Sequence, residues 1–262
     1  MNGLPVGLYL PGDSPLHRMN AGVKIICLFL LLTAVVCASS LFEYAALLVL
    51  TAGLILLSGA GFDAALRSVW RLRWFFCVIL LMNLFFFQPR QAWFRWWIFQ
   101  PSSEGLLRGI HTIVRVIPVL VFANLLQMTT RPLEMTRGLE WILSPLSFVG
   151  VPVDLIAMIL SVAIQFIPVL FEESDAIRKA QMARGAKFDS PRWLDKGKAV
   201  IPLVVPIFLA AFKRADEMSL AMEARGYRTD VRRKKHYHVR PGFYDRIGLV
   251  SCAAAALLFM IL

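Results

Sequence analysis

The stretch GVKIICLFLLLTAVVCA, residues 22–38, carries one charged side chain, that of Lys24, in an otherwise apolar run. A second run, LFEYAALLVLTAGLILLSGA, follows at residues 41–60. Both runs are continuous, without the alternation of a half-buried strand, and each approaches the roughly twenty residues that a helix needs to cross a bilayer. The short connection between them predicts a tight hairpin of two membrane-spanning helices.

Three further apolar blocks lie at residues 72–88, 105–128 and 244–262. Hydrophobic residues make up 58% of the 262 positions, which is more than the roughly half that is usual in soluble domains. We therefore expect an all-α polytopic membrane protein with about five transmembrane helices. The segment 151–170 is apolar enough to add one more crossing.

The basic residues flank the apolar blocks and give the chain a net charge of +11 at pH 7. This placement is typical of the positive-inside bias of membrane proteins, so we expect a lipid bilayer and no nucleic acid as their partner. The N-terminus and the Arg-rich loop at 61–73 are therefore predicted to be cytoplasmic. The stretch QAWFRWWIFQP, residues 91–101, mixes aromatic residues with one arginine and suits the outer headgroup region.

Three polar side chains lie within the fourth apolar block. Arg108, His111 and Arg115 are spaced i, i+3 and i+7, which places them on one helical face. Arg115 lies about 15 Å along this helix, and a cation at such depth usually faces a protein interior or an aqueous cavity. Three residues alone make a poor pathway for ions.

Three common catalytic motifs are absent from the sequence. It has no G-x-x-x-x-G-K-[ST] loop, no H-E-x-x-H and no G-x-S-x-G. Glu172, Glu173 and Asp175 resemble an acid–base cluster but more simply form a solvated helix face. The four cysteines have no metal-ligand spacing and indicate neither a metal site nor a disulfide framework; they are Cys27, Cys37, Cys77 and Cys252. We therefore expect no catalytic residue, no metal site and no cofactor in this chain.

The character of the sequence changes after residue 128. Residues 129–148 are amphipathic and suit a helix along the inner membrane face. Two segments, 151–185 and 198–226, each begin apolar and end charged, and they contain Pro168 in the first and Pro202 and Pro206 in the second. The organisation predicted is membrane helices over 1–128, long charged-ended helices over 129–230, and a basic stretch with a final membrane helix over 231–262.

A short sequence occurs twice near the ends of these segments. QMARGAKFD at 181–189 and MEARGYRTD at 222–230 share Ala-Arg-Gly at an offset of 41 residues. At the same offset Asp175 matches Asp216, Ala180 matches Ala221, Lys187 matches Arg228 and Asp189 matches Asp230. The one strongly apolar run between the motifs has about thirteen residues, too few to cross a bilayer. Basic residues surround both motifs, so both are predicted to be cytoplasmic.

The tripeptide itself suits an exposed helix end that binds a partner. Glycine after a helix adopts the left-handed turn without steric penalty, and small neighbours leave the arginine unobstructed. The guanidinium presents a planar set of donors to a carboxylate or to carbonyls in a groove. An ordinary capped helix end explains one such motif, whereas two with matching flanks favour a pair of binding surfaces.

These features together resemble the T component of energy-coupling factor (ECF) transporters, which are ABC-type importers of vitamins and of cobalt or nickel. The resemblance rests on the paired Ala-Arg-Gly motifs and on residues 105–140, which are similar to the family's fourth membrane helix and first coupling helix. It covers most of the chain.

The resemblance implies a scaffold in the bacterial plasma membrane, without catalytic activity, between two ABC ATPase subunits that bind ATP and a substrate-binding S component. One motif, Ala183, Arg184 and Gly185, would dock on one ATPase, and the other, Ala224, Arg225 and Gly226, on the second. Pro168, Pro202 and Pro206 would belong to the surface that holds the S component. A secondary transporter and an enzyme acting on a lipid-linked substrate are the alternatives.

Overall fold

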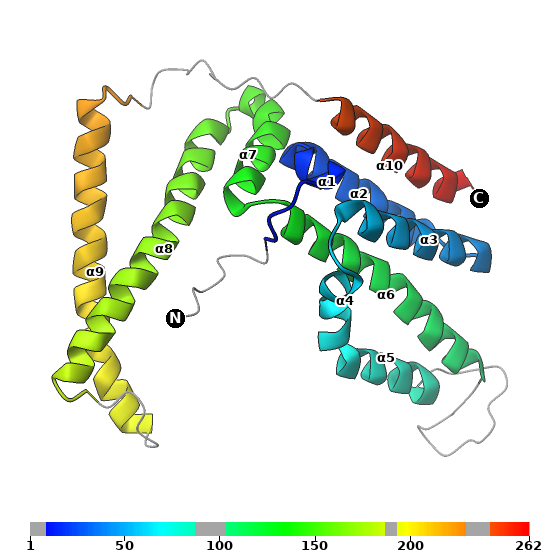
Figure 1. Cartoon of the computed structure of the whole chain (residues 1–262), viewed down its shortest axis with the longest axis horizontal. Helices are drawn as coiled ribbons and strands as arrows, with labels where there is room; N and C mark the ends of the chain where they lie inside the picture. The colour runs from blue at the N-terminus through cyan, green and yellow to red at the C-terminus, as the bar shows by residue number, and fades with distance from the viewer. Residues whose placement is uncertain (1–8, 87–102, 187–192, 229–241, 262) are drawn as a thin grey trace. The chain divides into compact units, whose positions relative to one another are not determined.

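The computed structural model describes residues 9–86, 103–186, 193–228 and 242–261, and every regular element in these ranges is a helix (Figure 1). The helices are α1 (Pro15–Arg18), α2 (Ala21–Cys37), α3 (Leu41–Ser58), α4 (Phe62–Arg71), α5 (Arg73–Phe86), α6 (Ser103–Thr129), α7 (Pro132–Leu143), the 3-10 helix η1 (Ser144–Val149), α8 (Val153–Ala183), α9 (Trp193–Ala224) and α10 (Phe243–Ile261). The expectation of an all-α membrane protein is confirmed.

Each of the five predicted apolar blocks forms a helix, although the helices differ in length. Three helices, α6, α8 and α10, are long and apolar enough to cross a membrane. The pair α4 and α5, bent by 52°, qualifies as a fourth span when taken together. The apolar helices α2 and α3 are shorter. The apolar character noted for residues 151–170 therefore reappears in α8, which is one of these three helices.

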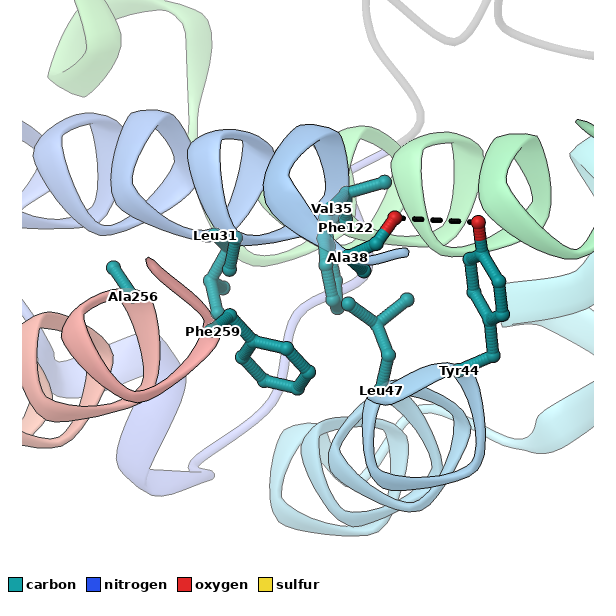
Figure 2. Close-up of a cluster of buried hydrophobic side chains, with 9 residues drawn as sticks. Leu31, Val35, Ala38, Tyr44, Leu47, Phe122, Ala256 and Phe259 are labelled. Carbon is teal, nitrogen blue, oxygen red and sulfur yellow. Dashed lines mark hydrogen bonds between the residues drawn. The ribbon is translucent and has the colours of Figure 1, made fainter. Parts of the chain in front are cut away.

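The helices divide into two compact units, one formed by residues 1–142 and 239–262 and the other by residues 143–238. In the first unit α2 lies along α10 and α6, and α6 also packs against α3, α4 and α5. Buried apolar side chains from α2, α3, α6 and α10 meet in one cluster (Figure 2); they include Leu31, Val35, Leu47, Phe122 and Phe259. The C-terminal helix is therefore part of the core formed by the N-terminal helices.

Arg115 holds the C-terminal end of α2. Its Nη2 donates to the carbonyl oxygen of Ala38 at 2.6 Å and to the Tyr44 hydroxyl at 3.1 Å, and that hydroxyl donates to the same carbonyl at 3.2 Å (Figure 2). Carbonyls in the last turn of a helix lack partners within the helix, so this arginine supplies one. Of the two surroundings expected for Arg115, a protein interior or an aqueous cavity, these contacts agree with the protein interior. His111, one turn earlier, packs edge-to-face on the Tyr44 ring.

Two buried polar side chains connect the start of α2 to distant parts of the chain. Lys24 donates from Nζ to the carbonyl of Thr129 at 2.8 Å and to the hydroxyl of Thr130 at 3.1 Å, at the end of α6. Asp245, in the first turn of α10, accepts the backbone N–H of Asn20 at 2.7 Å. Buried polar groups are stabilising only when they have such partners, so these bonds specify how α2, α6 and α10 meet.

Candidate functional site

The second unit contains α8 and α9, which pack against each other and run in opposite directions (Figure 1). The helices have 31 and 32 residues and continue without a break through Pro168 in α8 and through Pro202 and Pro206 in α9. The two C-terminal ends, which carry the two Ala-Arg-Gly motifs, therefore lie at opposite ends of the helix pair. The repeat alone did not indicate this antiparallel arrangement.

The end of α8 has the hydrogen bonds of a Schellman motif. Arg184 is the C-terminal cap residue, and Gly185 follows with a positive φ of 89°. The N–H of Gly185 donates to the carbonyl of Met182 at 3.0 Å, and the N–H of Ala186 donates to that of Gln181 at 3.0 Å. This pairing satisfies carbonyls that the helix leaves free.

The end of α9 repeats the same geometry. Gly226 has a φ of 70° and donates to the carbonyl of Glu223 at 2.8 Å, while the N–H of Tyr227 donates to that of Met222 at 2.9 Å. Arg225 takes the place that Arg184 has on α8. The left-handed glycine predicted for both motifs is thus confirmed, and the two copies share one backbone conformation.

Both motifs are open to solvent. Ala183, Arg184 and Gly185 are all exposed, as are Ala224, Arg225 and Gly226. A Cβ built on either glycine would meet no atom within 4 Å, so these glycines are required by backbone conformation and not by crowding. Within the described residues, neither arginine side chain has a hydrogen bond or an ion pair. Each helix end therefore presents an unengaged guanidinium.

We expect Gly185→Ala and Gly226→Ala each to destabilise the helix end by about 1 kcal/mol, because an L-residue with a side chain is disfavoured in the left-handed region. Amide hydrogen exchange in the last turn of α8 or α9 would then accelerate about fivefold. Asparagine tolerates this conformation better than alanine, so Gly185→Asn is the matched control and should exchange more slowly than Gly185→Ala. Equal exchange in both variants would contradict this role of the glycine.

Large apolar side chains on the two helices are exposed. On α8 these are Ile156, Ile159, Leu160, Ile167 and Phe171, and on α9 they are Val200, Ile201, Val204, Val205, Phe208, Leu209 and Phe212. Of the prolines between them, Pro202 is exposed and Pro168 and Pro206 are half-buried. Exposed apolar side chains in this number indicate contact with lipid or with another protein.

The carboxylates near the end of α8 form ion pairs on a solvated surface. Asp175 pairs with Lys179 at 2.6 Å, and both side chains are 56% exposed. Glu173 lies 3.9 Å from Arg214 of α9. The interpretation of these residues as a solvated helix face agrees with this geometry. The aromatic stretch 91–101, the basic stretch 232–240 and the repeat positions Lys187, Asp189 and Asp230 lie outside the described residues.

Comparisons with known proteins match nearly the whole chain. A family model described as a cobalt transport protein (CbiQ) matches residues 12–237. The chain is 36% identical over 260 residues to the energy-coupling factor transporter transmembrane protein EcfT of Listeria innocua, which covers 99% of this chain and 98% of the relative. It is also 36% identical over 262 residues to the EcfT protein of Bacillus subtilis, which covers 100% of this chain and 99% of that relative.

Proposed function

Because the chain belongs to the cobalt transport protein (CbiQ) family, among the transmembrane T components of energy-coupling factor transporters, we propose that it couples two cytoplasmic ATPase subunits to a substrate-binding S component. The chain serves as the non-catalytic membrane scaffold of the importer. The ATPase subunits bind and hydrolyse ATP, and their movement is transmitted through α8 and α9. The S component selects the substrate, a vitamin or a transition metal ion.

The observation that carries this proposal is the pair of matching, solvent-exposed helix ends, each with an arginine side chain that has no hydrogen bond or ion pair in the part of the chain that the structure describes. Two identical binding elements at opposite ends of a helix pair suit two equivalent partners. In this arrangement Ala183, Arg184 and Gly185 dock on one ATPase, and Ala224, Arg225 and Gly226 dock on the other. The planar guanidinium donates bidentate hydrogen bonds to a carboxylate or to carbonyls in a groove.

A membrane orientation belongs to this proposal, in which α8 does not cross the membrane although it is long and apolar enough to do so. If α8 and α9 lie along the cytoplasmic surface of the bacterial plasma membrane, both ends reach the cytosol although the helices are antiparallel. Their apolar faces then contact the bilayer and the S component, and Pro168, Pro202 and Pro206 belong to that surface. The N-terminus is cytoplasmic by the positive-inside rule.

A secondary transporter has less support. It would need a polar pathway through the membrane helices, and Arg115 was its deepest candidate. The guanidinium of Arg115 instead donates hydrogen bonds to the Ala38 carbonyl at the end of α2 and to the Tyr44 hydroxyl. An enzyme acting on a lipid-linked substrate also has less support. Such an enzyme would rely on His111, and the ring of His111 packs against Tyr44.

A conservative substitution tests the role of the guanidinium. We expect Arg184→Lys to reduce ATP-dependent uptake about tenfold, because an ammonium keeps the charge but loses the planar donor pair. The measurement uses the complex purified with its ATPase and S subunits in vesicles, with radiolabelled Co²⁺ and a panel of tritiated vitamins as probes. Wild-type uptake would show that charge alone is sufficient. Failure of the tagged wild-type chain to co-purify any ATPase subunit would refute the proposed function itself.

A further inference from the structure

The repeat extends further towards the N-terminus of the two helices than the Ala-Arg-Gly motifs indicate. At the same offset of 41 residues, Phe-Glu-Glu at 171–173 corresponds to Phe-Lys-Arg at 212–214. The two copies keep the aromatic residue and reverse the charge of the two positions after it. Charge is therefore opposite between the copies at this place, whereas the arginine of the helix ends is the same in both.

At the second of the two charge-reversed positions, the residue of α8 and the corresponding residue of α9 lie close together. Arg214 Nη2 lies 3.9 Å from Glu173 Oε2, and the two side chains are 41% and 34% exposed. When two equivalent elements pack about a two-fold axis, a residue that meets its own equivalent lies on that axis. Identical charges at such a position would repel each other. The reversed charge turns a repulsive self-contact into an attractive one.

The ion pair is also equidistant from the two helix ends. Arg184 lies eleven residues after Glu173 (184 − 173), and Arg225 lies eleven residues after Arg214 (225 − 214). At a rise of about 1.5 Å per residue, each arginine is roughly 16 Å along its helix from the pair. Because α8 and α9 run in opposite directions (Figure 1), the two arms extend away from the pair in opposite senses.

We propose that Glu173 and Arg214 are positioning residues that form the pivot between α8 and α9, and that this pivot sets the separation of the two ATPase-binding ends. The inference rests on the proposed function. A rotation about the pivot moves both ends by the same amount, so closure of two ATPase subunits acts on the helix pair symmetrically. A partly exposed ion pair contributes little to stability, which permits the crossing angle to change during the transport cycle.

A charge swap tests this pivot in the complete complex. We expect Glu173→Arg and Arg214→Glu, each alone, to lower the amount of probe accumulated per ATP hydrolysed about threefold to fivefold, because like charges then meet at the axis. Both ATPase subunits should still co-purify at the wild-type ratio. The combined Glu173→Arg/Arg214→Glu variant should restore the ratio of uptake to hydrolysis to within about twofold of wild type. The probes are radiolabelled Co²⁺ and the tritiated vitamin panel.

The control is Asp175→Arg, which breaks the pair with Lys179 within α8 and leaves the pivot intact. It should keep the wild-type ratio of uptake to hydrolysis. An unchanged ratio in both single variants, or a combined variant no better than either one, would overturn the pivot. So would a loss of ATPase subunits that the combined variant does not restore. All of these outcomes leave the docking of Arg184 and Arg225 standing, because that is tested by variants of the arginines themselves.

Discussion

The Arg184→Glu/Arg225→Glu double variant is expected to lose both ATPase subunits and all ATP-dependent uptake. In the proposed docking, each substitution places a carboxylate where the partner accommodates a guanidinium. Removing one member of a buried interfacial charge pair typically costs about 2–5 kcal/mol, which weakens binding by roughly thirtyfold to several thousandfold per site. A carboxylate at a helix C-terminus is also unfavourable in the field of the helix dipole. With both ends changed, no strong attachment remains.

The two single variants make this prediction sharper. Because the ends lie apart on the helix pair, Arg184→Glu and Arg225→Glu should each retain one ATPase subunit and lose the other. Subunit stoichiometry after affinity purification, measured by native mass spectrometry, distinguishes these states. Lys179→Glu is the matched control, since it applies the same charge reversal to an exposed side chain on α8, one turn before the motif. It should keep two ATPase subunits.

The double variant must have the helix content and the monodisperse elution of the wild type. A loss of ATPase subunits can then be assigned to weaker binding and not to unfolding of the variant. A double variant that is folded and still carries two ATPase subunits would refute docking through these arginines. A folded variant that keeps its subunits but transports nothing would assign the arginines to transmission and not to attachment.

The features that were predictable from the sequence are local ones. Each apolar block became a helix, because length and continuous hydrophobicity are properties of one segment. Gly185 and Gly226 were assigned as left-handed caps, because that conformation depends on the glycine and the helix preceding it. The repeat likewise identified both helix ends without any knowledge of the fold.

The features that were not predictable depend on contacts between distant segments. The sequence indicated that Arg115 faces a protein interior or an aqueous cavity, but it did not indicate the acceptor, Ala38, which lies 77 positions away. Asp245 meets Asn20 across 225 positions, so the packing of α10 on α2 left no local signal. The opposite directions of α8 and α9 and the contact of Glu173 with Arg214 were also hidden. Hydrophobic pattern specifies which face of a helix is apolar, and does not specify which helix covers it.

A close approach of α7 to the start of α2 leads to the second large effect. Gly138 lies so near to α2 that a Cβ on it would be 2.5 Å from the backbone nitrogen of Gly22 and 2.8 Å from the carbonyl carbon of Ala21. These are backbone atoms, so a rotamer change cannot relieve the overlap. The α2 side of the same contact is equally close: a Cβ on Gly22 would be 2.8 Å from Cε3 of the Trp141 ring of α7. Two helices can approach this closely only through glycine.

We therefore expect Gly138→Ala to destabilise the chain by about 1–3 kcal/mol, the usual effect of overpacking a tight interior contact. The matched control is Gly53→Ala in α3, where a Cβ would meet no atom within 4 Å. There the same substitution should stabilise by roughly 0.5–1 kcal/mol, because alanine loses less conformational freedom in a helix than glycine. Thermal unfolding in detergent measures both, at about 2–4 °C per kcal/mol. The melting temperatures of the two variants should shift in opposite directions because only Gly138 contacts α2. A melting temperature of Gly138→Ala at or above that of the wild type would mean that α7 does not pack against α2.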